Sequence, residues 1–171
     1  MIGGVNVAHF EKIFGALERA NVRFIVVGGV AVIAHGVVRY TNDLDLVMAF
    51  DEKNLHAGVA ALEACGFKAK IPVSAEAFAR AENRRKWARE KGMVVFQMAL
   101  FVEDDLPIDI FIEPPFSFED EYARAVRYEL APNLFVPVVA VPQLIEMKRR
   151  VGRPRDLDDI SRLERLGSLP S

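Results

Sequence analysis

The sequence predicts an α/β fold of the α+β kind, with a mixed β-sheet, helices packed on one face and further helices at the C-terminus. Short β-branched and aromatic runs alternate with amphipathic runs of helical period. Hydrophobic residues make up 51% of the 171 residues, which is enough for a substantial core. No stretch resembles a long linker. We therefore expect one domain over residues 1–171, with a core at about 20–140 and a helical part at about 141–166.

The N-terminal half is expected to begin with a helix, because Phe10, Ile13 and Leu17 recur at helical spacing within residues 7–20. The β-branched and aromatic run at 24–27 ends at two glycines and predicts a buried strand. The other elements expected in this half are a short helix at 30–35 that Gly36 closes, a strand at 44–48 and an amphipathic helix at 52–64.

The C-terminal half is predicted to open with a long charged helix at 75–91, which Gly92 would end. Two strands should follow at 93–102 and 107–112, joined by the acidic turn at 103–105. The proline at position 107 is compatible with the start of a strand. The remaining expected elements are a helix at 118–126, two short strands around Pro132-Asn133, and two helices at 141–151 and 157–166.

Composition excludes several classes of protein. The formal net charge is −2, so the chain as a whole lacks the positive charge of a general nucleic-acid binder. The single cysteine, Cys65, has no partner for an internal disulfide, and no Cys/His cluster has zinc spacing. The longest uncharged run, residues 24–38, is too short to cross a membrane. We expect a soluble, cytoplasmic protein with no membrane partner.

Two aspartates stand one residue apart in an apolar segment, VVGGVAVIAHGVVRYTNDLDLVM at residues 26–48. Side chains alternate along a strand, so Asp43 and Asp45 should share one face while Leu44 and Leu46 enter the core. Two close carboxylates repel each other, and Mg²⁺, which prefers oxygen ligands, would remove that conflict. The alternative is a pair of solvated turn or helix-cap residues.

The glycine pair Gly28-Gly29 precedes these aspartates and follows a predicted strand. Glycines let backbone approach an anion closely, and a helix that follows would direct free N–H groups toward it. The strand, the glycines and the short helix therefore favour a phosphate site. Arg39 and Thr41, between the glycines and the aspartates, either contact phosphate or order the loop.

Together these motifs resemble the signature of the nucleotidyltransferase superfamily, whose fold is that of the DNA polymerase β catalytic domain. That signature is an apolar strand, Gly-Gly or Gly-Ser, and then Asp-x-Asp between apolar residues. The extended pattern His-Gly-x-x-Arg-x-Thr-x-Asp-x-Asp resembles the branch of abortive-infection-type toxins and small antibiotic nucleotidyltransferases. Many active relatives have a serine that would touch the triphosphate at the position of Gly29.

The resemblance implies a two-metal site. Asp43 and Asp45 would hold Mg²⁺ against the triphosphate of an NTP such as ATP. Asp109, an acid inside the apolar strand PIDIF, is the candidate third carboxylate, which would join a second Mg²⁺ and accept the proton of the acceptor hydroxyl. The implied nucleotide-binding residues are Gly28, Gly29, Arg39, Thr41 and Lys148.

The reaction implied is transfer of an NMP from an NTP to an acceptor hydroxyl on RNA, a protein or a small molecule. A second hypothesis is an inactive nucleotidyltransferase-like binding module of a toxin–antitoxin pair, with a partner protein. A third is a phosphohydrolase with an aspartate nucleophile, which the preceding Gly-Gly and Arg-x-Thr do not favour.

Two further segments have two interpretations each. Residues 152–155, GRPR, resemble the core of an AT-hook, but the acidic residues that follow favour a helix start capped by Asp156. Residues 82–91 present basic side chains around Trp87, as an RNA surface or as an exposed helix with Trp87 packed inward. His35 is assigned no role.

Overall fold

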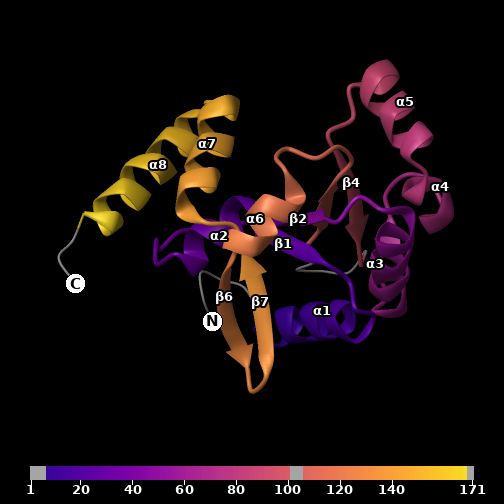
Figure 1. Cartoon of the computed structure of the whole chain (residues 1–171), viewed down its shortest axis with the longest axis horizontal. Helices are drawn as coiled ribbons and strands as arrows, with labels where there is room; N and C mark the ends of the chain where they lie inside the picture. The colour runs from indigo at the N-terminus through magenta and orange to yellow at the C-terminus, as the bar shows by residue number, and fades with distance from the viewer. Residues whose placement is uncertain (1–6, 101–105, 169–171) are drawn as a thin grey trace.

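A seven-stranded mixed sheet, with strand order β3-β4-β5-β2-β1-β7-β6, organises the computed structural model, which describes residues 7–100 and 106–168 (Figure 1). The strands are β1 (Phe24–Val27), β2 (Leu44–Met48), β3 (Lys68–Ala69), β4 (Val95–Ala99), β5 (Ile108–Phe111), β6 (Val126–Ala131) and β7 (Leu134–Val138). The helices in the described ranges are α1 (Val7–Arg19), α2 (Gly28–Ala34), α3 (Glu52–Ala64), α4 (Ala75–Ala79), α5 (Ala81–Lys91), α6 (Phe118–Arg124), α7 (Val141–Val151) and α8 (Pro154–Gly167). The predicted fold class is confirmed.

The centre of the sheet mixes strand directions. β2 runs antiparallel to β1 and parallel to β5, while β1 runs parallel to β7. Val26 lies opposite Leu46 in the β1–β2 ladder, and Leu46 lies opposite Ile110 in the β2–β5 ladder. Side chains of paired residues point to the same face, so one apolar layer runs across all three strands.

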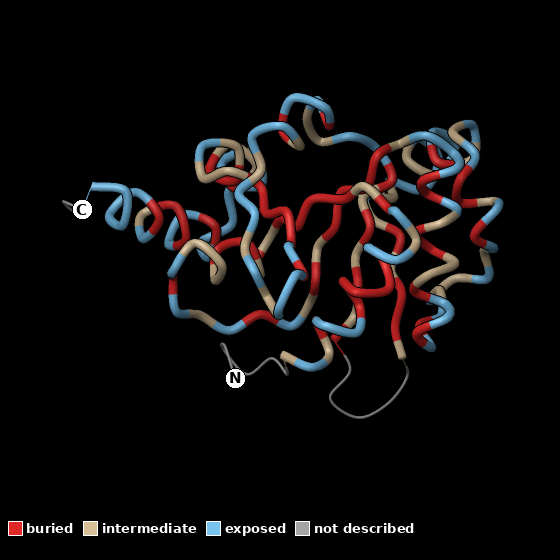
Figure 2. The backbone as a smooth tube through the Cα atoms, turned by 60° about the horizontal axis from the view of Figure 1, so that its bottom comes forward, coloured by how far each residue is buried: buried red, intermediate tan, exposed pale blue. Residues whose placement is uncertain are grey.

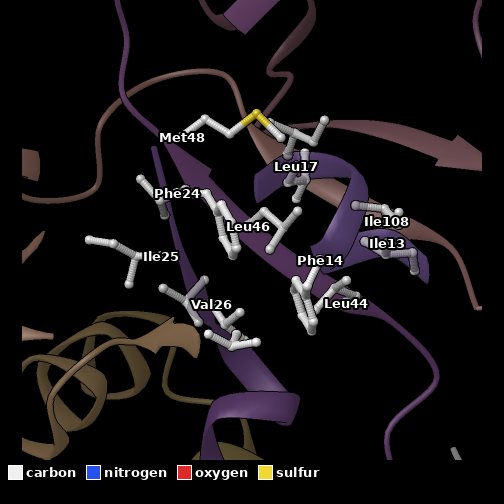
Figure 3. Close-up of a cluster of buried hydrophobic side chains, with 14 of the residues drawn as sticks. Ile13, Phe14, Leu17, Phe24, Ile25, Val26, Leu44, Leu46, Met48 and Ile108 are labelled. Carbon is white, nitrogen blue, oxygen red and sulfur yellow. The ribbon is translucent and has the colours of Figure 1, made fainter. Parts of the chain in front are cut away.

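This apolar layer packs against α1 and α3. Phe14 of α1 stacks on Phe24 with ring centroids 5.6 Å apart, and Figure 3 shows Phe14 and Leu17 beside the leucines of β2. Met48 reaches Gly58 of α3, where an added Cβ would lie 2.5 Å from the Met48 sulfur. Burying each of these large side chains stabilises the fold by about 1.5–3 kcal/mol. Figure 2 shows the buried residues concentrated along the sheet.

The predicted single helix at 75–91 is wrong, because the chain forms two helices with Arg80 extended between them. The break is a tertiary effect. Arg84, only 4% exposed, donates to the carbonyl oxygens of Phe78 (2.9 Å) and Ala79 at the end of α4. It also donates to Ile112 O at 3.2 Å, beside β5. The buried guanidinium therefore satisfies carbonyls that a continuous helix would bond internally.

Smaller differences concern element ends. α2 begins at Gly28 rather than at residue 30, and residues 125–126 leave the helix predicted at 118–126 so that β6 can start. α8 begins at Pro154, three residues before the predicted start, and β3 was not predicted. The acidic turn predicted at 103–105 lies outside the described residues. Within the described ranges, every helix is too short or too polar to span a lipid bilayer.

The GRPR segment and His35, whose functions the sequence left undecided, both have structural roles. The GRPR segment opens α8, with Arg153 at its N-cap and Asp156 accepting from the Arg153 backbone N–H at 3.2 Å. His35 joins α2 to the β6–β7 hairpin, with Nε2 2.7 Å from Val139 O and Nδ1 2.9 Å from the Tyr128 hydroxyl. Trp87 is partly buried and packs against the core.

Candidate functional site

Two of the predicted carboxylates lie side by side in the sheet. Asp45 of β2 is the register partner of Asp109 of β5, so both side chains project from the same face. This is the face opposite the apolar layer, because Leu44 and Leu46 on either side of Asp45 point into that layer. Asp43 lies one residue before β2. The sheet thus brings the three acidic residues to one region.

Each carboxylate makes a specific contact. Gln97 of β4, the register partner of Asp109, donates through Nε2 to Asp109 Oδ1 at 2.5 Å. The Thr41 hydroxyl donates to Asp43 Oδ1 at 3.0 Å. The Gly29 backbone N–H donates to Asp45. Asp45 and Asp109 are therefore oriented by residues of other elements, and Asp43 by a residue of its own loop.

Burial and neighbouring acids make the ionised forms of Asp45 and Asp109 less favourable. Burial, followed by the charges of Asp43 and Asp109, raises the pKa of Asp45 to about 7. The Gly29 hydrogen bond and the charge of Lys148 act in the opposite direction. Burial also raises the pKa of Asp109, with a contribution from Asp43, against the hydrogen bond from Gln97. A cluster of this kind binds a proton or a cation readily.

Gly28 gives Asp45 the space that it occupies. Its φ is +64°, and a Cβ there would lie 1.9 Å from Asp45 Oδ2. Any other residue would combine a strained backbone with a direct clash. The glycine pair, predicted as a phosphate contact, thus has a structural role at the carboxylates, and whether it also holds phosphate stays a prediction.

Gly29 is matched to Thr41. A Cβ at position 29 would lie 2.3 Å from Thr41 Oγ1 and 2.9 Å from Thr41 Cβ. The Thr41 side chain therefore fills the space that a serine at position 29 would need. Its hydroxyl lies beside the glycine pair and bonds Asp43. Where relatives with Gly-Ser have a serine hydroxyl, this chain has Gly29 and the hydroxyl of Thr41 beside it.

Arg39 and Lys148 converge on one buried carboxylate. Arg39 Nη1 lies 2.6 Å and Lys148 Nζ 2.7 Å from the same oxygen, Asp159 Oδ2. Lys148 Nζ also lies 3.4 Å from Asp156 Oδ1. Lys148, Asp156 and Asp159 are 6%, 3% and 2% exposed. These ion pairs connect α7 and α8 to the loop that leads to the aspartates.

Asp156 has two functions in this network. It closes the capping box at the start of α8, and it binds the Arg153 side chain, with Nε 2.8 Å from Oδ2. Burial opposes its ionisation, but the Arg153 hydrogen bond and the charge of Lys148 outweigh it, and the pKa of Asp156 is lowered. Asp156 therefore stays negatively charged at neutral pH.

A cavity of about 100 Å³ connects the two groups of residues. Gly28 and Asp45 line one side of it, and Lys148, Arg153 and Asp156 line another. Apolar walls come from Val27, Phe111, Leu144, Met147 and Val151. The structure therefore brings Lys148 to the same cavity as Asp45 and Gly28, while Arg39 and Thr41 lie behind the glycine pair.

The donor chemistry fits a hard divalent cation, because carboxylate oxygens are the ligands that Mg²⁺ prefers. The observation that supports this fit is the register pairing of Asp45 with Asp109, at which burial raises the pKa of both carboxyl groups. No three His, Cys, Asp or Glu side chains in residues 7–100 and 106–168 already converge as a metal-binding group. A cation would therefore have to draw the three carboxylates together.

Two site residues were missed by the sequence analysis. Gln97 is recognisable only from the β4–β5 register, since glutamine in a strand carries no signal of its own. Asp159 was assigned no role, although Asp156 and Asp159 stand three residues apart on α8 and so share a helix face. That spacing, with Lys148 on the preceding helix, was the available signal.

Comparisons with known proteins define the fold. Neither a protein-family model nor a curated protein sequence matches the chain. Among solved structures, it is similar to an antigenic nucleotidyltransferase-like protein from Paracoccidioides brasiliensis, with 16% identity and a TM-score of 0.56. The alignment covers 99% of this chain and 80% of that one. The chain therefore has a nucleotidyltransferase-like fold.

Proposed function

We propose that this protein is a Mg²⁺-dependent nucleotidyltransferase that moves an NMP from an NTP to an acceptor hydroxyl. The observation that carries the proposal is the lateral pairing of Asp45 with Asp109, with Asp43 close enough to raise the pKa of both. A nucleotidyltransferase-like fold supports it. RNA, a protein or a small molecule is the proposed class of acceptor.

The carboxylates have a defined part in the proposal. Asp43, Asp45 and Asp109 would hold Mg²⁺, which when bound would neutralise phosphate charge and polarise the phosphorus–oxygen bond. Asp109, the register partner of Asp45, would also accept the proton of the attacking hydroxyl. The hydroxyl oxygen then bonds to the α-phosphorus, the bond to the β-phosphate oxygen breaks, and pyrophosphate leaves.

The remaining residues would position the nucleotide. Backbone around Gly28 and Gly29 lies beside Asp45 and would contact the outer phosphates. Lys148 lines the same cavity as Gly28 and would reach phosphate once it releases Asp156 or Asp159. Arg39 and Thr41 would hold the loop in place, through Asp159 and Asp43 respectively.

A second function, a nucleotidyltransferase-like binding module such as one half of a toxin–antitoxin pair, is supported by a different observation. Arg39 and Lys148, the cations assigned to the triphosphate, are already paired with Asp159. The cavity beside Gly28 holds about 100 Å³, below the range of roughly 300–1,000 Å³ usual for ligand pockets. In this account the site binds no nucleotide and the surface of the fold binds a partner protein.

Label transfer separates the two functions. The protein is incubated with Mg²⁺ and each of the four α-³²P-labelled NTPs, in the presence of total RNA, a protein fraction or a small-molecule fraction. An Asp43→Ala/Asp45→Ala variant and the isosteric Asp45→Asn variant serve as inactive controls. Asp120→Asn, a change at an exposed aspartate in the first turn of α6, is the matched control that should retain activity.

Transfer to one fraction that requires Mg²⁺ and Asp45 supports the transferase. Absence of both transfer and Mg²⁺-dependent NTP binding by calorimetry supports the binding module instead. A phosphoaspartyl intermediate detected by mass spectrometry would point to the phosphohydrolase chemistry that the Gly-Gly and Arg-x-Thr motifs do not favour.

A further inference from the structure

A second, larger cavity lies on the other side of the sheet from the carboxylates. It holds about 260 Å³ between α1, α2 and the β6–β7 hairpin, which lie close together in Figure 1. Val26 of β1 forms part of its wall. The next residue, Val27, is the register partner of Asp45 and points to the opposite face. The two cavities are therefore separated by β1.

The wall of this cavity is almost entirely apolar. Phe10 and Phe14 of α1, Val30 and Ile33 of α2, and Val138 of β7 contribute to it. The floor is closed, because Val26 and Val138 are 0% and 2% exposed. The more accessible lining residues come from α2, where Val30 and Ala34 are half-buried, and from β6, where Glu129 is exposed.

The polar groups at the cavity already have partners. His35 Nε2 lies 2.7 Å from the carbonyl oxygen of Val139 and must donate to it, so Nδ1 is the acceptor of the Tyr128 hydroxyl at 2.9 Å. The Glu129 carboxylate accepts from the Asn133 N–H at 3.2 Å in the hairpin turn. Neither Tyr128 nor Glu129 needs water from the cavity for these bonds, and an apolar cavity without polar partners is a poor site for water.

The size and chemistry together define a ligand class. An apolar cavity of roughly 150 Å³ stays dry and binds benzene, and this cavity is larger. A charged ligand would lose its hydration here without gaining a buried ion pair, since Glu129, the one charged residue among those that line the cavity in the described chain, is exposed to solvent. We propose that the cavity between α1, α2 and the β6–β7 hairpin is a binding site for a compact, uncharged, apolar molecule of one or two rings.

Such a ligand would contact the element that carries the glycine pair. Val30, Ile33 and Ala34 belong to α2, which begins at Gly28 beside Asp45. A molecule bound here would therefore contact α2 and could change its position without touching the carboxylates. The proposal does not rest on nucleotide transfer, and the test below reads binding alone.

The test uses three ligands of the same shape and different charge: toluene, benzoate and benzylammonium. Each is titrated into the full chain with selective ¹³C-methyl labels on Val and Ile, and methyl chemical shifts are followed by NMR. The proposal predicts saturable toluene shifts confined to Val26, Val30, Ile33, Val136 and Val138, which line the cavity. Benzoate and benzylammonium should bind at least tenfold more weakly, because both would bury an unpaired charge.

The second part of the test uses variants that fill the cavity. Ala34→Phe places a ring inside the cavity and should weaken toluene binding at least tenfold, with the melting temperature unchanged or higher. Ala123→Phe makes the same change at an exposed position of α6 and should bind toluene as the wild type does. Val30→Leu is a milder filling variant if Ala34→Phe does not fold.

Three results would overturn the proposal. They are the absence of saturable toluene shifts, shifts at methyls away from this cavity, and benzoate or benzylammonium binding as tightly as toluene. Toluene binding that neither filling variant weakens would also contradict it. Each of these results can occur whether or not the chain transfers nucleotides.

Discussion

Asp45 and Asp109 are lateral neighbours in the parallel β2–β5 ladder, and burial raises the pKa of both. A fold gains nothing from such a pair when no cation is bound. Like charges on adjacent strands destabilise the sheet, and a pair of this kind on the face opposite the apolar layer is more typical of a functional site than of a structural one. The predictions below follow from this pair and from the residues that surround it.

The amount by which Asp45 lowers the free energy of unfolding should depend on pH. Burial first, and then the charges of Asp43 and Asp109, raise its pKa to about 7 in the folded chain from 3.8 in the unfolded chain, so the folded state binds the proton more tightly. Stability attributable to this group is complete below pH 3.8 and is lost as pH rises through 7. Asp45→Asn should therefore raise the free energy of unfolding at pH 8 by on the order of 2–4 kcal/mol, with little effect near pH 4.

Urea denaturation of wild type and Asp45→Asn at the two pH values measures this difference. Asp120→Asn, at an exposed site, should change stability by less than about 0.5 kcal/mol at either pH. Equal stability of the wild type and Asp45→Asn at pH 8 would mean that Asp45 is ionised without cost.

Magnesium should relieve the same repulsion. At pH 8 saturating Mg²⁺ should raise the melting temperature of the wild type, and EDTA should reverse the rise. A ligand at a hundredfold excess over its Kd stabilises by about 2.7 kcal/mol. The rise should be smaller at pH 6, where Asp45 is largely protonated, and absent in Asp45→Asn. An equal rise in both proteins would place the cation elsewhere.

Gly29 and Thr41 should behave as a coupled pair. Gly29→Ser introduces a Cβ 2.3 Å from Thr41 Oγ1, so it should destabilise the wild type by about 1–3 kcal/mol. Thr41→Gly removes both atoms that the serine would meet, and the double variant should recover most of that loss. A double-mutant cycle by thermal denaturation gives the coupling energy. Additive effects would contradict the steric account.

Removing the Asp159 side chain should lower the free energy of unfolding more than replacing Lys148 does. Asp159→Ala leaves the buried Lys148 and the partly buried Arg39 without their shared oxygen and should cost about 3–5 kcal/mol. Lys148→Met keeps the Arg39–Asp159 pair and the Arg153–Asp156 pair, so it should cost less. Chemical denaturation of both variants measures the order. A larger cost for Lys148→Met would mean that Asp159 is held mainly by Lys148.

Local pattern was enough to predict the elements that carry the carboxylates. The strand at 24–27 and the strand at 44–48 have the predicted limits, as do the helices at 52–64 and 141–151. Apolar pattern points to all four elements, and a following glycine supports three of them, at 24–27, 52–64 and 141–151. The assignment of Asp45 to one face and Leu44 to the other follows directly from strand alternation.

Long-range contacts account for what the sequence did not predict. The break at Arg80 depends on Arg84, whose guanidinium bonds carbonyls from α4 and from the segment after β5. The burial of Lys148 depends on Asp159, which comes from a different helix. Both cations look like solvated surface residues in the sequence, because the groups that pair with them are identified only after the helices pack.

A crystal structure with Mn²⁺ and a non-hydrolysable NTP tests the central claim most directly, since the anomalous signal of Mn²⁺ marks the cation without ambiguity. The account predicts an anomalous peak within about 2.5 Å of carboxylate oxygens from Asp43 and Asp45, with Asp109 adjacent and the triphosphate beside Gly28. A nucleotide and metal bound elsewhere, or a peak that contacts none of the three aspartates, would contradict it.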